Sequence, residues 1–175
     1  MKRWVPYVVV ALAIAACSCW IITAQAASDM PAVNLNINSA GPRQVEDSTE
    51  KALTRDYARA WNSMESALAE NRVDGLDADF AGVALDEVKD RVTQQRESGL
   101  HTRFIDHGHH LQAVFYSPEG SAVQLTDQAH FEIQYLDGDK VLHSEQRTAN
   151  YTVVMTAGEN RWKVRVLQEN PAQPE

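Results

Sequence analysis

The densest group of chemically capable side chains lies in the segment FIDHGHHLQ. It holds an aspartate and three of the six histidines of the chain, namely Asp106, His107, His109 and His110. Imidazole nitrogens and carboxylate oxygens are the ligands that zinc and related metals take in proteins. On a regular strand, His107 and His109 would share one face, so this pair is the candidate metal site.

Other features of the segment argue against metal chemistry. Arg103 has the same parity as the two histidines and would place a positive charge close to the metal. Gly108 lies between the histidines and is typical of a β-bulge at a solvent-facing rim. No HExxH spacing occurs in the chain. The pattern therefore favours a polar rim or contact surface, with a metal site or a pH sensor as the alternatives.

Asp127 is the second chemically capable residue, because it interrupts the apolar side of a long alternating segment. The other odd positions there carry Val123, Leu125, Ala129, Phe131, Ile133 and Tyr135. A carboxylate on such an inner face must be paired, hydrogen-bonded or open to a pocket. Counting back from the turn at Asp137 places Arg147 near Asp127, so an Asp127–Arg147 ion pair is predicted.

Two roles are open for this predicted pair. In the structural role, it ties two strands together where the sheet meets water. In the functional role, Asp127, Arg147, Tyr57 and Trp61 line a mouth that receives a small polar ligand or a side chain of a partner. Structural ion pairs and functional pockets both perturb such groups, and we favour the structural role.

The first 26 residues are expected to lie outside the folded domain. Lys2 and Arg3 precede an uncharged segment that lasts until Asp29 and is about long enough to cross a bilayer. Three interpretations remain open: a secretory signal cleaved before Ala27, a retained membrane anchor, or a lipoprotein leader that is lipidated at Cys17. Each of them exports the remaining chain to an extracytoplasmic location, the periplasm or the cell surface.

The exported part is acidic and free of cysteine. Two of the 16 basic residues lie in the leader, so 14 remain against 24 acidic residues, a net charge of −10. Such a surface repels phosphate backbones, which argues against nucleic-acid binding. The absence of cysteine excludes a disulfide framework, thiol catalysis and cysteine-ligated zinc in the domain. No glycine-rich phosphate loop or nucleophile elbow occurs, so no cofactor is expected.

The remaining sequence divides into a linker, two helices and a run of strands. Residues 27–46 are predicted to form the linker, although the alternation of Val33, Leu35 and Ile37 also fits a short edge strand. Apolar residues at three- to four-residue spacing predict helices over about 47–71 and 85–98. Alternation at a period of two predicts four antiparallel strands over about 100–116, 121–136, 140–156 and 162–169. Residues 47–169 are thus predicted to form an α+β domain, followed by a disordered tail over 170–175.

Three segments in these elements resemble the nuclear-transport-factor-2-like superfamily. They are the helix DYARAWNSMESAL, the segment LDADFAG and the closing strand GENRWKVRVLQ. Over about 54–169 the pattern is most similar to the intermembrane-space domain of plastid-division proteins and their bacterial relatives. The resemblance implies a cone, in which N-terminal helices pack on a strongly curved, antiparallel four-stranded sheet. It implies no activity, because this fold hosts enzymes, binders and scaffolds alike.

These features together predict an exported, membrane-tethered interaction domain without enzymatic activity. It would be an accessory or assembly subunit of a cell-envelope complex, with another envelope or membrane protein as partner and a homodimer through the sheet as a further interface. The alternative is a periplasmic small-molecule binder or enzyme that uses the cone interior, with Asp127 and a histidine as an acid–base pair. A deep cavity with a polar floor would favour the alternative, whereas a cone filled by aromatic side chains would favour the interaction domain.

Overall fold

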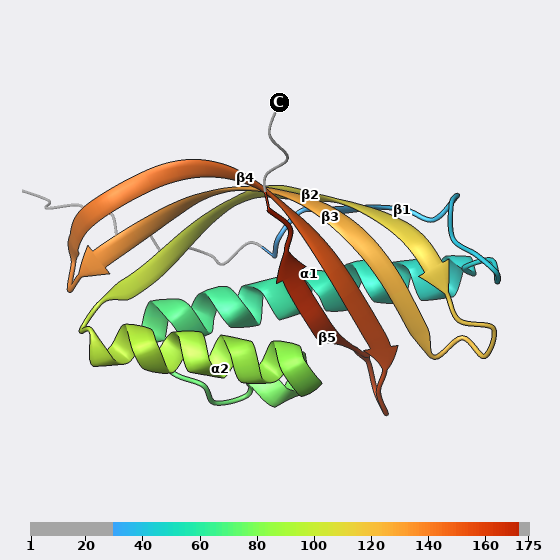
Figure 1. The fold of residues 1–175 in the computed structure, drawn as a ribbon, viewed down its shortest axis with the longest axis horizontal. Helices are drawn as coiled ribbons and strands as arrows, with labels where there is room; N and C mark the ends of the chain where they lie inside the picture. Colours follow the sequence, from blue (N-terminus) through green and yellow to red (C-terminus); the bar gives the residue numbers. More distant parts are fainter. Residues whose placement is uncertain (1–29, 172–175) are drawn as a thin grey trace, which may run out of the picture.

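Two α-helices, a short 3-10 helix and five strands make up residues 30–171, the part of the chain that the computed structural model describes. In chain order they are β1 (Val33–Asn36), α1 (Asp47–Glu70), η1 (Leu76–Ala78), α2 (Gly82–Glu97), β2 (His101–Tyr116), β3 (Ala122–Asp137), β4 (Lys140–Ala157) and β5 (Trp162–Glu169). Figure 1 shows that α1 and α2 lie on the same side of a strongly curved sheet. The predicted leader, with its lipidation candidate Cys17, and residues 172–175 lie outside the described residues.

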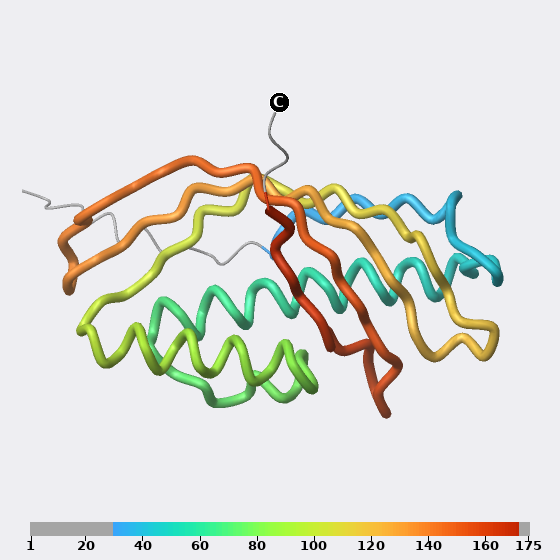
Figure 2. Tube along the Cα trace, in the orientation of Figure 1, coloured from blue at the N-terminus to red at the C-terminus, as the bar shows by residue number. Residues whose placement is uncertain are grey.

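The long helix α1 forms where the predicted apolar stripe lies, and it fills the hollow of the sheet. Leu53, Tyr57 and Leu68 on this stripe have no exposed surface, and Trp61 and Met64 are almost as deeply buried. Residues three and four apart share one face of a helix, so the stripe covers a single side of α1. The helix ends at Asn71, which takes the left-handed conformation with φ of 55°. In Figure 2 the sheet bends over α1 along its length.

The sheet has five strands in the order β1-β2-β3-β4-β5, which corrects the predicted four-stranded antiparallel sheet. The antiparallel meander from β2 to β5 is confirmed, but β1 pairs with β2 in parallel, with Leu35 opposite Leu111. Leu35 and Val45 both belong to the hydrophobic core. Part of the segment predicted as a linker therefore belongs to the fold. β1 has the sequence VNLN, in which two apolar residues alternate with two asparagines. So short a pattern does not specify a strand by itself, and β1 forms because it pairs with the edge of β2.

Irregularities in β2 bend the sheet and change which side chains face the core. The register against β3 shifts once between Asp106 and Gly108, and again between Ala113 and Phe115. Gly108 has φ of 119°, a conformation that residues with a side chain rarely adopt. A β-bulge inserts one extra residue and reverses the alternation that follows it. Inward-facing positions are therefore even-numbered before the first bulge and odd-numbered from His109 to Ala113, and Tyr116 faces inward after the second bulge.

None of the helices within 30–171 is long and apolar enough to cross a membrane.

Candidate functional site

A polar cluster lies buried between α1 and the inner face of the sheet. One carboxylate oxygen of Asp127, Oδ2, accepts a hydrogen bond from the Tyr57 hydroxyl at 2.7 Å. The same oxygen lies 2.7 Å from Nδ1 of His109. The side chains of Asp127 and His109 have no solvent exposure, and neither has Tyr57. A carboxylate on the inner face must be paired or hydrogen-bonded, and Oδ2 of Asp127 has two such partners.

Three elements bring these residues together. Asp127 projects inward from β3 because it occupies the apolar parity of that strand. His109 projects inward from β2 because it follows the bulge at Gly108, and it lies opposite Ala129 in the register. Tyr57 comes from the buried stripe of α1. The cluster therefore depends on the bulge as much as on the alternation of either strand.

Two further carboxylates extend the cluster around His109. Asp106 places Oδ1 3.3 Å from the second ring nitrogen of His109, Nε2, and also accepts a hydrogen bond from the backbone N–H of Gly108 at 3.1 Å. Glu65 lies on α1, one turn after Trp61, and its Oε1 is buried. His109 is therefore surrounded by carboxylates on both of its ring nitrogens.

This arrangement changes the pKa of several groups. Burial lowers the pKa of His109, but the carboxylates of Asp106 and Asp127 outweigh burial and raise it to about 9. Burial, together with the negative charge of Asp106, raises the pKa of Glu65 to about 7. Burial, together with the charge of Asp127, raises the pKa of Tyr57 well above 10. At neutral pH the imidazole of His109 is therefore a buried cation held by carboxylates.

Trp61 separates the cluster from solvent. Its ring lies 4.5 Å from that of His109, measured between ring centroids. Its other neighbours include Phe104, Phe131 and Tyr151, whose ring centroids lie within 6.3 Å of it. Trp61 thus lies between the buried polar cluster on one side and these three aromatic rings on the other.

Four buried polar atoms in this region have no aligned hydrogen-bond partner within 30–171. They are Trp61 Nε1, Glu65 Oε1, His109 Nε2 and Asp127 Oδ1. Such atoms in a native protein call for a bound water, a ligand or a functional reason. Their concentration around Trp61 and His109 makes this interior the chemically most unusual part of the described chain.

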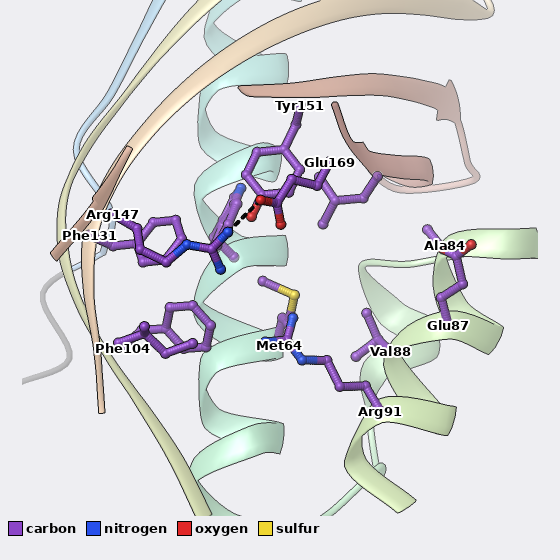
Figure 3. A pocket seen from close by; sticks show the side chains of 13 residues that line it. Met64, Ala84, Glu87, Val88, Arg91, Phe104, Phe131, Arg147, Tyr151 and Glu169 are labelled. Carbon is purple, nitrogen blue, oxygen red and sulfur yellow. Dashed lines mark hydrogen bonds and ion pairs between the residues drawn. The ribbon is translucent and has the colours of Figure 1, made fainter. Parts of the chain in front are cut away.

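Above Trp61, a pocket of about 220 Å³ opens between α2 and the concave face of the sheet (Figure 3). Its walls are aromatic and aliphatic and carry two arginines and two glutamates toward the opening. The lining residues are Trp61, Met64, Ala84, Glu87, Val88, Arg91, Phe104, Phe131, Ile133, Arg147, Tyr151, Leu167 and Glu169. We refer to this pocket as the mouth.

The charged side chains of the mouth differ in how they are held. Arg147 donates a hydrogen bond to Glu169 at 2.6 Å, drawn in Figure 3. Arg91 lies over the ring of Phe104, 5.9 Å from its centroid, and forms no ion pair with any described residue. Burial raises the pKa of the Tyr151 hydroxyl to about 12. The mouth therefore offers an apolar interior and one arginine that is free to meet an anionic group.

The predicted Asp127–Arg147 ion pair does not form. Asp127 lies opposite Tyr151 in the β3–β4 register, and Arg147 lies opposite Phe131. The register shift between Tyr135 and Leu136 moves the pairing by one residue, so it accounts for only one of the four positions that separate Arg147 from Tyr151. The partner of Arg147 is Glu169 on β5. Sequence alternation placed both residues on the inner face but did not place them opposite one another.

The predicted common face for His107 and His109 is also wrong. The bulge at Gly108 sends His107 outward and His109 into the core. His110 is exposed on the outer face, where its ring lies 5.9 Å from that of His130. No group of three or more His, Cys, Asp or Glu side chains in the described part of the chain could hold a metal ion.

Of the four residues predicted to line a mouth, Trp61 and Arg147 do so. Tyr57 and Asp127 lie below Trp61, out of contact with solvent. The alternative function paired Asp127 with a histidine, and the structure places His109 against Asp127. Sequence reasoning missed Glu65, although its position four residues after Trp61 places it on the buried side of α1.

Comparison with known proteins identifies the fold. No protein-family model matches the chain, and neither does any curated protein sequence. The crystal structure of the intermembrane-space region of the chloroplast protein ARC6 superposes with a TM-score of 0.60 at 15% identity, covering 73% of this chain and 98% of that one. A candidate dehydratase of the NTF2-like family from Streptomyces avermitilis gives 0.45 at 10% identity, covering 71% and 99% of the two chains. A candidate scytalone dehydratase from Novosphingobium aromaticivorans gives 0.48 at 13%, covering 71% and 89%.

The described chain has the nuclear-transport-factor-2-like fold, as its sequence resemblance predicted. The similarity to the intermembrane-space domain spans nearly all of that domain. At 15% identity it establishes the arrangement of helices and strands and no activity.

Proposed function

We propose that the protein is an exported, membrane-tethered interaction domain whose mouth receives an apolar side chain of another cell-envelope protein. The observation that carries this proposal is the filling of the cone by aromatic side chains. The rings of Phe104, Phe131 and Tyr151 pack against Trp61 and line the mouth. The domain would serve as an accessory or assembly subunit of an envelope complex.

The size of the mouth supports a side chain as its occupant. Pockets for drug-sized molecules measure roughly 300–1,000 Å³, whereas the mouth encloses about 220 Å³. Aromatic anchors buried in such a pocket dominate the binding energy of many protein interfaces. Arg91, which has no ion-pair partner among the described residues, would meet a carboxylate next to that anchor.

The test is recovery of the partner from native membranes by chemical cross-linking of the full chain. We expect one stoichiometric partner with the wild-type protein, and at least a tenfold loss with Tyr151→Ala or Arg91→Glu. Arg96→Glu, a matched reversal of charge at the exposed end of α2, should retain the partner. Equal recovery with all variants, or no stoichiometric partner, would contradict the proposal.

The contact between Asp127 and His109 favours a second candidate function, acid–base chemistry on a small molecule. His109 is protonated at neutral pH, so the pair has the geometry of a general acid with its orienting carboxylate. It would act only if Trp61 moved aside, because the ring of Trp61 covers His109. A screen for compounds that raise the melting temperature tests this function. A compound whose effect disappears in Asp127→Asn and persists in Gln128→Ala would support catalysis over partner binding.

A further inference from the structure

The outer face of the sheet carries a broad stripe that lacks charged side chains. This surface is defined by two rows of residues that follow the register across neighbouring strands. The first row is Asn34, His110, Gln128 and Asn150, and the second is Asn36, Gln112, Thr126, Thr152 and Gln168. We refer to these residues as the amide stripe.

The amide stripe is exposed and uncovered. All members of the first row are exposed, and only Thr152 in the second is half-buried. Both α-helices lie on the opposite side of the sheet (Figure 1), and no described helix or strand packs over the stripe. An open hollow of about 530 Å³ lies over it, lined by Asn34, Asn36, His110, Leu111, Gln112, Thr126, Asp127, Gln128, Asn150, Tyr151 and Asn170. The side chain of Asp127 has no solvent exposure and belongs to the buried cluster.

The absence of charged side chains from the amide stripe is informative because the rest of the chain has many of them. Charged residues make up 23% of the sequence, and they tend to occupy exposed positions. They reappear on the same face beyond the His130–Thr148 pair, where Glu132 lies opposite Gln146. Depletion of charge on one exposed area marks a surface that is desolvated on binding. A surface of amides and hydroxyls is suited to a ligand that is itself polar and uncharged.

Hydrogen-bonding capacity on the stripe is largely unused. The side chains of Asn34, Gln128 and Asn150 form no hydrogen bond with any other described residue. Each amide offers two donors and one acceptor oxygen, the combination that sugar hydroxyl and acetamido groups require. Adjacent strands lie about 4.8 Å apart, so the side chains within one row repeat at a spacing similar to the length of one sugar ring.

An aromatic side chain stands at one end of the stripe. Phe115 on β2 is 42% exposed and lies opposite Gln124, two residues along β3 from Thr126. A fully buried position is the usual one for phenylalanine. An exposed aromatic ring next to unpaired amides can stack on the apolar face of a sugar while the amides bind its polar edge.

We propose that the amide stripe and Phe115 form a binding site for an uncharged polysaccharide, which runs along the rows and crosses the strands with successive sugars over successive strands. The site lies on the face opposite the mouth and would operate independently of any protein partner there. A second copy of the chain is the competing occupant, since amides can also pair with amides.

The test uses isothermal titration of the full chain, purified in a detergent without a sugar headgroup, with chitohexaose and cellohexaose as probes. We expect saturable binding of at least one probe, weakened at least tenfold by Gln128→Ala combined with Asn150→Ala. Phe115→Ala should weaken binding at least threefold. Gln146→Ala, on the same face of β4 but beside Glu132, is the matched control and should leave the affinity unchanged.

Several outcomes would overturn the proposal. The first is the absence of binding by either probe, and the second is a double variant that binds as tightly as the wild type. Tighter binding of polygalacturonate, an acidic polysaccharide, would contradict the selectivity for uncharged sugars. A dimer in analytical ultracentrifugation that Gln128→Lys dissociates, without binding of either probe, would assign the stripe to contact between copies.

Discussion

His109 and His110 are neighbours in the sequence and occupy opposite environments. His109 is fully buried, with carboxylates on both ring nitrogens and Trp61 over its ring. His110 is exposed among neutral amides on the outer face. The two faces of one sheet thus concentrate charge on the inside and exclude it from part of the outside. This inverts the usual distribution, in which charged groups face water. The inner face consequently holds the groups whose loss matters most to stability, and the outer face holds groups free to bind.

The largest expected effect on this contrast comes from removing the buried carboxylate. Asp127→Ala should lower the free energy of unfolding by about 3–5 kcal/mol, because it leaves His109 charged and buried with a single ion-pair partner. Gln128→Ala, the adjacent position on the outer face, should change it by less than about 0.5 kcal/mol. Urea unfolding of both variants measures the difference. Similar losses at both positions would refute the contrast between the two faces.

The next effect is a dependence of stability on pH. The pKa of His109 is about 9 in the folded protein and 6.5 in the reference state, so folding favours the protonated imidazole. Its contribution is complete below pH 6.5 and is lost as pH rises through 9. The loss amounts to about 3 kcal/mol. The pKa of Glu65 is raised to about 7 in the folded protein, so its contribution to the free energy of unfolding also falls as pH rises from 4.5 to 7.

Unfolding free energies measured from pH 6 to pH 10 test this dependence. The decline above pH 6.5 should disappear in His109→Gln and persist in His110→Gln. A wild-type protein that is equally stable at pH 6 and pH 10 would show that His109 is neutral when buried.

A smaller effect is expected at the bulge that separates the two histidines. Gly108→Ala should cost about 1–3 kcal/mol, because φ of 119° strains any residue with a side chain and the added methyl group would approach the carbonyl oxygen of Ala32 to 3.4 Å. Gly138→Ala is the matched control in open space, where φ of 56° costs about 1 kcal/mol. Equal losses in the two variants, measured by urea unfolding, would mean that the bulge is not under conformational constraint.

The smallest effect is expected at the rim of the mouth. The Arg147–Glu169 pair is 36% and 43% exposed, so Glu169→Gln should change the free energy of unfolding by less than about 1 kcal/mol. The change should shrink further at high salt, since exposed ion pairs are screened. A loss as large as that of Asp127→Ala would mean that the Arg147–Glu169 pair stabilises the fold as much as the buried carboxylate does. Thermal unfolding at low and high salt provides this measurement.

Local patterns were sufficient to predict both α-helices, the meander from β2 to β5 and the buried sides of α1 and β3. The three-to-four spacing from Leu53 to Leu68 specified α1 and its buried face, and the alternation of β3 placed Asp127 on the inner face. The mouth residues Trp61 and Arg147 followed from the same two periodicities. These features depend only on how a regular helix or strand distributes consecutive side chains.

Contacts between elements required the folded chain. The parallel pairing of β1 with β2 depends on a sheet edge that the residues of β1 do not encode. The bulge at Gly108 reverses the alternation of β2, and the shift near Leu136 changes the partner of every residue further along β4.

The sequence by itself determined that this chain would place a carboxylate inside an α+β domain and gather histidines on one strand. Only the tertiary structure decided that His109 turns inward to Asp127, Tyr57 and Asp106 while His110 turns outward to the amide stripe. The physical reason is that side-chain alternation is exact along a regular strand, and one extra residue at a bulge reverses it. Whether that extra residue is accommodated depends on the curvature that the sheet adopts around α1.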